Sequence, residues 1–185
     1  MKVNLTFSYG RQIIVKNTNC KWLPETVSLN DYNGDFEAYF KYLYKVFDND
    51  LIKNPPLFKG EKVKARWTPM HENKPEAFYH LTHKDYMHTG YDTRLFDTKR
   101  SERLHWIKPT IQNYGCNNTC CSHIKYWTEK KGKTIFILFE DEYYIIILNK
   151  RKDYYLLVTA YYIETEHRRN LIHKQYERAI KAKDV

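Results

Sequence analysis

Residues 135 to 162 constrain the fold more than any other stretch, because they predict three consecutive strands. Runs of Ile, Leu, Phe, Tyr and Val occupy 136–139, 144–148 and 154–158. Such β-branched and aromatic residues favour a pleated, half-buried backbone. Polar residues separate the runs, and their spacing is typical of an antiparallel meander. We therefore expect a central antiparallel sheet built on this segment.

The third run continues without a turn into Thr159, Ala160, Tyr161 and Tyr162. Alternate side chains of a strand point to opposite faces, so Thr159 and Tyr161 share one face. Either that pair or Tyr162 can reach a site while the other is buried. Hydroxyl groups are thus predicted at the end of a buried strand, where a sheet protein can present chemistry.

Helices are expected on either side of this segment in the sequence. Apolar residues recur at helical spacing over 36–47, and Asp35 is placed to cap that helix. Thr165 is placed to cap a last helix that runs to residue 183. Further strands are predicted at 3–9, 12–15, 61–67 and 77–82. In residues 83–133 the apolar residues show no clear helical or strand periodicity. We predict a single α+β domain over residues 1–185, with helices packed on one face of the sheet.

The chain is basic, with 31 Lys and Arg against 22 Asp and Glu and a net charge of +9 at pH 7. Such a chain attracts polyanions, of which nucleic acid is the commonest. The 17 Tyr, 9 Phe and 4 Trp suit base stacking beside these cations, although most rings must belong to the core. A soluble basic protein without a charged ligand is the ordinary alternative.

Several classes of protein are not indicated. No apolar run approaches the ~20 residues that span a bilayer, and the first residues are too polar for a secretory signal. Four Cys, two of them adjacent, do not resemble a disulfide framework. We expect a cytoplasmic protein with reduced thiols, no membrane partner and no cofactor. The lack of an organised acidic cluster argues against a two-metal nuclease.

A cluster of possible metal ligands lies between residues 116 and 123. Its members are Cys116, Cys120, Cys121 and His123. This spacing differs from the paired cysteines of zinc sites, and adjacent cysteines point in different directions in most backbones. We predict that no metal binds here and that Cys120 or Cys121 is buried as a small apolar residue.

Other polar residues are candidates for chemistry. His80 lies in the predicted 77–82 strand, where a histidine is either a structural residue or a general acid or base. Arg100 and Arg103 share a face if their segment is helical, and arginine can bind a phosphate. The alternative is a surface turn in which Glu102 pairs with either arginine. Trp106 is expected to anchor this segment on the sheet.

The order of these segments resembles a known family. The chain carries FEAYFKYLYKVF, PPLFKGEKVKARW, FYHLT, KRSERLHWIKPTIQN, IKYW, the meander, and DYYLLVTAYYIETEHRRNLIHKQYE. This order is similar to that of a group of phage- and prophage-associated bacterial proteins. We associate the group with the barnase–EndoU–colicin–RelE superfamily of ribonucleases. The resemblance covers nearly the whole chain.

The resemblance implies metal-independent cleavage of RNA by its own 2′-hydroxyl on the open face of a small sheet. It implies a toxin or phage-conflict effector, with RNA and an inhibitor or antitoxin protein as partners. The residues that match are His80 as general base or acid, Arg103 and Arg100 on the phosphorane, and Thr159 and Tyr161 on the phosphate. Thr82, Arg100 and Trp106 are the expected substrate-binding residues.

A second proton-transfer group is needed for such a reaction, and Tyr161, His105 or His123 would have to supply it. The alternative function is a basic RNA- or DNA-binding regulatory module without catalysis. The third alternative is a protein-binding antitoxin or inhibitor. Such a protein would have to mimic RNA, and the basic net charge makes this one a poor mimic. Cleavage of RNA in EDTA distinguishes the first two.

Overall fold

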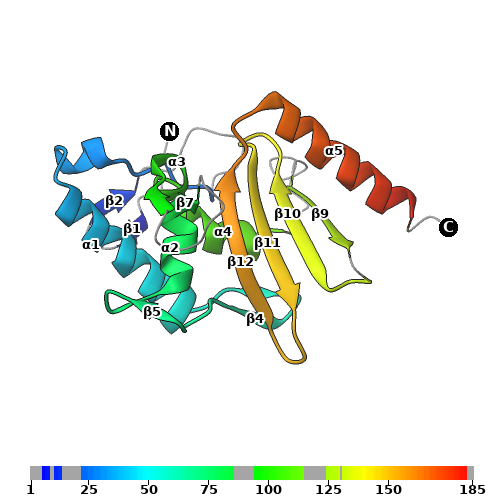
Figure 1. Ribbon diagram of the computed structural model, residues 1–185, viewed down its shortest axis with the longest axis horizontal. Coiled ribbons are helices and arrows are strands. Elements are labelled where there is room, and N and C mark those ends of the chain that lie inside the picture. The colour runs from blue at the N-terminus through cyan, green and yellow to red at the C-terminus, as the bar shows by residue number, and fades with distance from the viewer. Residues whose placement is uncertain are drawn as a thin grey trace.

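The computed structural model describes residues 22–85, 94–114, 124–129 and 131–182, and the backbone of 6–8 and 11–13. Figure 1 shows a sheet with helices on both sides of it. The helices are α1 (Phe36–Phe47), α2 (Glu76–Thr82), α3 (Thr98–Ser101), α4 (Ile107–Gln112) and α5 (Glu166–Lys181), with shorter helical turns at Leu29–Tyr32, Asp48–Lys53 and Leu104–Trp106. The strands outside the main sheet are β1 (Thr6–Ser8), β2 (Arg11–Ile13), β5 (Met70–His71), β6 (Lys74–Pro75), β7 (His83–Asp85) and β8 (Arg94–Phe96).

The main sheet has six strands in the order β3-β4-β12-β11-β10-β9. Its members are β3 (Leu57–Phe58), β4 (Glu61–Lys64), β9 (Ile124–Glu129), β10 (Thr134–Phe139), β11 (Tyr144–Lys150) and β12 (Tyr155–Tyr162). The antiparallel meander predicted from residues 135–162 is confirmed. The sheet is nevertheless mixed, because β4 pairs with β12 in parallel. With one buried side chain in four residues, β4 carries little sequence signal for that pairing.

Each face of the sheet has its own apolar cluster. On one face, Ile137, Ile146 and Leu157 pack in the larger core that includes Leu43 of α1 and Ile111 of α4. On the other face, Leu138 and Ile145 pack with Ile172 of α5. The α+β class is confirmed. The prediction that helices pack on one face holds for α1 and α4 but not for α5, which lies across the opposite face (Figure 1).

The two predicted helix caps are confirmed. The Asp35 carboxylate accepts a hydrogen bond from the amide of Ala38 at 3.0 Å. The Thr165 hydroxyl accepts one from the amide of Arg168 at 3.3 Å. Both bonds satisfy an amide that the first turn of a helix leaves without an intrahelical partner.

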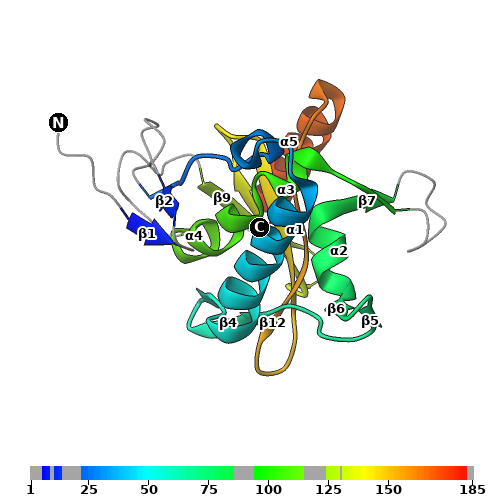
Figure 2. The same ribbon diagram turned by 90° about the vertical axis from the view of Figure 1, so that its left-hand side faces the viewer.

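The 77–82 segment is a helix, α2, and the predicted strand is wrong. The buried side chains Ala77, Phe78, Leu81 and Thr82 recur at helical spacing. Pro75 precedes the first turn and Glu76 lies in it, as helix starts favour. The aromatic content suggested a strand, but Phe78 packs against Phe40 and Phe47 of α1 instead. Figure 2 shows α1 and α2 next to each other.

Only the first part of β12 is paired with β4, at Tyr155 and Leu156. Beyond them, the edge of β12 faces α2 and α3 (Figure 1). The pairing of β12 with β11 also shifts, because Ile147 lies opposite Thr159 and Leu148 opposite Leu157. Val158 is the extra residue of this bulge and is exposed. The edge and the bulge leave room for a hollow beside β12.

Candidate functional site

A hollow of about 570 Å³ lies between the edge of β12, α2 and the β7–β8 hairpin. We call it the central hollow. Five cationic side chains line it, and no Asp or Glu does so among the residues that the structure describes. The cations are Arg66, Lys84, Arg94, Arg100 and Arg151. This concentration of positive charge favours an anionic ligand.

His80 lines the central hollow from the second turn of α2. One helical turn earlier, Glu76 places its Oε1 3.4 Å from His80 Nε2. The same oxygen lies 3.8 Å from Nη1 of Arg94. Partial burial and then Arg94 lower the pKa of His80, and Glu76 opposes them by raising it. His80 is therefore a largely neutral imidazole at pH 7, held by a carboxylate, which suits a general base.

His83 is a second histidine of the central hollow. Its Nδ1 lies 2.9 Å from the Thr82 hydroxyl. That hydroxyl donates its own proton to the Phe78 carbonyl at 2.8 Å, so it accepts from His83 Nδ1–H. Nε2 is then the nitrogen of His83 that can exchange a proton. Burial, followed by Arg94, lowers the pKa of His83.

Arg100 connects α2 to the end of β12. Its Nη1 donates to the His80 carbonyl at 2.8 Å, and its Nε lies 3.4 Å from the carboxylate of Asp97. The guanidinium also lies over the ring of Tyr161, with its Cζ 5.4 Å from the ring centre. Arg100 is thus held in position by three elements while it lines the central hollow.

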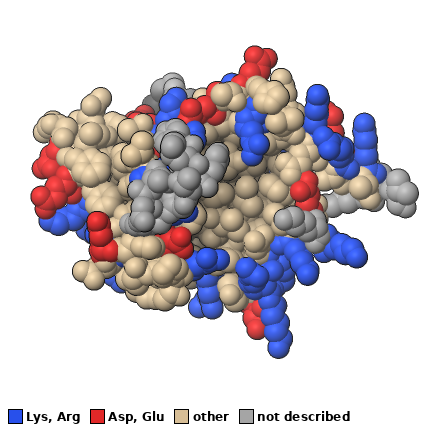
Figure 3. Space-filling view, in the orientation of Figure 1, with Lys and Arg blue, Asp and Glu red and all other residues tan. Residues whose placement is uncertain are grey.

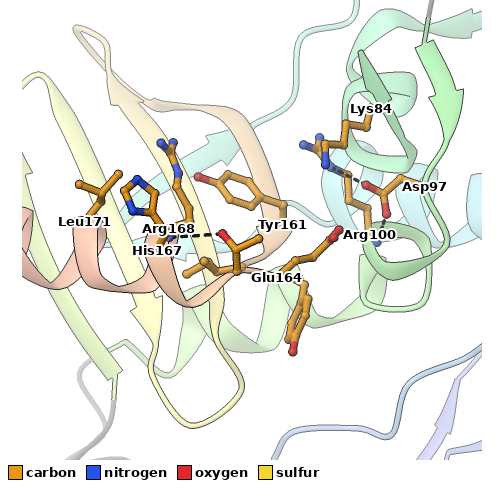
Figure 4. Close-up of a pocket in the computed structure, with 11 residues that line it drawn as sticks. Lys84, Asp97, Arg100, Tyr161, Glu164, His167, Arg168 and Leu171 are labelled. Atoms are coloured by element: carbon orange, nitrogen blue, oxygen red, sulfur yellow. Dashed lines mark hydrogen bonds and ion pairs between the residues drawn. The ribbon is translucent and has the colours of Figure 1, made fainter. Parts of the chain in front are cut away.

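Thr159 and Tyr161 lie on the same face of β12, as predicted, since they pair with Ile147 and Ile145 of β11. Thr159 lines the central hollow. Tyr161 lines a neighbouring hollow of about 590 Å³, which we call the tyrosine hollow. In Figure 4, Tyr161 lies between Arg168 on one side and Arg100 and Lys84 on the other. Arg100 and Lys84 line both hollows, so the two adjoin each other.

Arg103 is not part of this group, and the predicted cluster of His80, Arg103 and Tyr161 is wrong in that respect. Arg103 lines neither hollow. Its guanidinium lies over Trp106 and Tyr162, and Tyr162 is on the opposite face of β12 from Tyr161. Because α3 ends at Ser101, Arg100 and Arg103 do not share a helical face.

Two predicted substrate-binding residues are inaccessible. Thr82 is fully buried, and its hydroxyl is hydrogen-bonded to Nδ1 of His83. Trp106 is fully buried against the ring of Tyr144. Trp106 therefore anchors its segment on the sheet, as expected, and cannot stack on a nucleotide.

The predicted sources of a second proton-transfer group also change. His105 is buried, and its Nε2 donates to the Glu25 carbonyl at 2.7 Å, so it cannot reach a substrate. His123 and the cysteine cluster at 116–121 lie outside the described residues. His83, which the sequence prediction missed, lies in the hollow with His80.

The missed residues are Glu76, His83, Lys84, Arg94, Arg66 and Arg151. A helical interpretation of 76–82 would have revealed one of them, because Glu76 and His80 are four residues apart. The others come from separate strands and loops, and only the folded chain brings them together.

The face of the sheet that α5 covers only in part adjoins the central hollow. Figure 3 shows Lys and Arg along the lower edge of this side of the molecule and also at its upper right, over α5. No group of three or more His, Cys, Asp or Glu that could hold a metal occurs in the described part of the chain. Within the same residues, none of the helices is long and apolar enough to cross a membrane.

No family model matches the chain, and neither the curated proteins nor the solved structures contain a match to it.

Proposed function

We propose that the protein is a metal-independent ribonuclease that cleaves RNA at the central hollow. The observation that carries the proposal is the Glu76–His80–Arg94 group in a hollow lined by five cations and a second histidine. A phosphodiester needs positive charge around its oxygens and an imidazole to move a proton. The central hollow offers both within one cavity.

His80 serves as the base in this mechanism. It takes the proton of the RNA 2′-hydroxyl, and the 2′-oxygen forms a bond to phosphorus. The bond between phosphorus and the 5′-oxygen breaks, and protonated His83 gives its Nε2 proton to that oxygen. The products are a 2′,3′-cyclic phosphate and a 5′-hydroxyl. Since both pKa values are lowered, this pairing of a neutral and a charged histidine is most populated below pH 6.5.

The arginines stabilise the charge that develops on the phosphorane. Arg100 is fixed by Asp97 and by the His80 carbonyl, so it costs little reorganisation during the reaction. Arg94 lies beside the histidines and is only 12% exposed, which strengthens its interaction with an anion. Thr159, on the edge of β12, is placed to hydrogen-bond a phosphate oxygen.

A non-catalytic RNA- or DNA-binding module is the second candidate. The five cations of the central hollow favour it equally, because they bind phosphate whether or not it reacts. The orientation of His80 by Glu76 is the feature that binding alone does not require. Catalysis is therefore the preferred proposal.

Cleavage of end-labelled RNA in EDTA tests the proposal. We expect products with cyclic or 3′-phosphate ends, and resistance of a substrate with 2′-deoxyribose at the cleaved position. His80→Ala should reduce the rate by about 10²–10⁴-fold with little change in RNA affinity.

His173→Ala is a matched control for His80→Ala. His173 on α5 is exposed to a similar extent, 36% against 40%, and also has a glutamate partner, Glu140 at 3.1 Å. It lies outside the central hollow, and its loss should leave cleavage unchanged. Salt-sensitive RNA binding by the wild-type protein, with no cleavage of a broad RNA panel, would favour the non-catalytic module.

A further inference from the structure

A third hollow extends the site in the other direction along β12. It measures about 520 Å³ and is lined by Trp67, Tyr154 and the cations Lys64, Arg66 and Arg151. We call it the tryptophan hollow. It shares Arg66, Arg151 and Leu156 with the central hollow. The three hollows therefore adjoin one another in a row along β12, which we call the track, with the central hollow in the middle and the tyrosine hollow at the far end.

Aromatic rings stand at both ends of this track. Trp67 is 48% exposed and makes no ring or cation contact with the part of the chain that the structure describes. An exposed indole beside Lys64, Arg66 and Arg151 is free to stack on a base. At the other end, the half-buried ring of Tyr161 lines its hollow beside Arg100 (Figure 4). Accessible aromatic rings beside cations are the pattern that binds unpaired bases.

The charges along the track are unequal. All charged residues that line the tryptophan and central hollows are basic. Asp97 and Glu164 line the tyrosine hollow, where Asp97 is paired with Arg100. Phosphates are therefore held most strongly from the centre towards Trp67.

We infer that single-stranded RNA lies lengthwise along β12 and occupies at least three nucleotide positions, one in each hollow. One base stacks on Trp67, another contacts Tyr161, and the phosphate between them lies at His80. The position of the reacting phosphate rests on the proposed function, whereas the track itself does not. Bases of a duplex are stacked on each other and cannot enter separate hollows, so single strands are the substrate class.

Binding of uncleavable RNA tests the track. Fluorescein-labelled 2′-O-methyl oligonucleotides of one to eight residues cannot supply the attacking hydroxyl. At constant salt, their anisotropy should show affinity rising at each step up to at least three nucleotides and then levelling off. A duplex of the same length should bind more weakly. Affinity that levels off at one nucleotide, or a preference for duplex, would overturn the inference.

Trp67→Leu and Tyr161→Leu locate the two ends. Each should weaken binding of an eight-residue oligonucleotide by roughly 5- to 100-fold, the range expected for one lost stacking contact. Trp67→Phe keeps a smaller ring and should lose less. Phe36→Leu is the matched control, because Phe36 is an equally exposed ring (46%) that lines none of the three hollows.

Tryptophan fluorescence supplies an independent signal. Of the four Trp, Trp106 and Trp127 are fully buried. Trp22 packs against Phe139 and lines none of the three hollows. Quenching by a stacked base therefore arises mainly from Trp67 and should disappear in Trp67→Phe. Unchanged quenching in that variant would contradict the placement of a base on Trp67.

The two proposals can fail separately. Length-dependent binding of the uncleavable RNA, without cleavage of the same unmodified sequence, would contradict the proposed ribonuclease activity but support the RNA-binding track. Cleavage in EDTA, combined with an RNA affinity that is independent of length and unaffected by Trp67→Leu, would contradict the track but support the ribonuclease activity.

Discussion

At the scale of single residues, the proposed chemistry depends on two charges that act on His80 in opposite directions. Glu76 raises its pKa and Arg94 lowers it, and both lie at the central hollow or directly behind it. His80 and Arg100 could be predicted from the sequence because histidine and arginine are residue types that suit phosphate chemistry. It could not reveal Arg94 or His83, because their relation to His80 depends on a helix and a hairpin that have weak local signals.

The titration of His80 should therefore move in opposite directions in two variants. Glu76→Gln removes the group that raises the pKa, so the pKa of His80 should fall further below 6.5. Arg94→Met removes a group that lowers it, so the pKa should rise. Carbon-13 NMR of the histidine ring carbons measures both. Shifts of the same sign in the two variants would contradict the geometry.

Buried His105 should make the stability of the fold depend on pH. Burial lowers its pKa to about 4, against 6.5 in the unfolded chain. Between these values the unfolded state binds the extra proton, so stability should fall as the pH drops from about 6.5 to 4, by roughly 3 kcal/mol in all.

Urea unfolding at a series of pH values measures this dependence. His105→Gln keeps a donor for the Glu25 carbonyl but cannot titrate, so its stability should fall less steeply over the same range. Identical pH slopes in the two proteins would show that His105 does not carry the effect.

At the scale of elements, helices and strands could be predicted from the sequence where their apolar residues recur with a clear periodicity. The meander and α1 have long, unambiguous patterns, and both are confirmed. α2 has only seven residues with five of them buried, so its composition resembles a buried strand. The β4–β12 pairing and the position of α5 arise from contacts between distant segments, for which no local pattern exists.

The short helix α3 should matter for function as well as for stability. Asp97 caps it, accepting from the Arg100 amide at 3.1 Å, and also holds the Arg100 guanidinium. Asp97→Ala should destabilise the protein by about 1 kcal/mol and reduce RNA cleavage, since Arg100 is no longer fixed.

Asp35→Ala is the control, because Asp35 makes the same kind of cap on α1, away from the hollows. It should have a similar effect on the urea midpoint and none on cleavage. Equal losses of cleavage in both variants would mean that general destabilisation, and not the position of Arg100, explains the result.

At the scale of the whole molecule, the net charge of +9 predicted an anionic partner but not where it binds. The structure collects cations from four separate parts of the chain around one hollow: Arg66, Lys84 with Arg94, Arg100, and Arg151. Basic residues that are far apart in the sequence thus lie together at the central hollow. For this reason they could be counted from the sequence but not assigned to a site.

RNA affinity should accordingly depend strongly on salt. Each phosphate neutralised on a single strand contributes a slope of about −0.7 to log K against log salt, so the central hollow should give a slope between about −2 and −4. Arg151→Gln should make that slope less negative by about 0.7. Anisotropy titrations from 50 to 300 mM salt measure both, and a slope near zero would exclude phosphate binding at these side chains.

The parallel pairing of β4 with β12 joins segments that are about ninety residues apart in the chain. Contacts within the β9–β12 meander are local, so the meander can form early, whereas closing so long a loop is slow. We therefore expect the central hollow to form only after that late step. A ribosome making this protein releases α2 well before β12 follows it. Under the proposed function, a nascent chain therefore has no assembled site with which to cleave the message that encodes it.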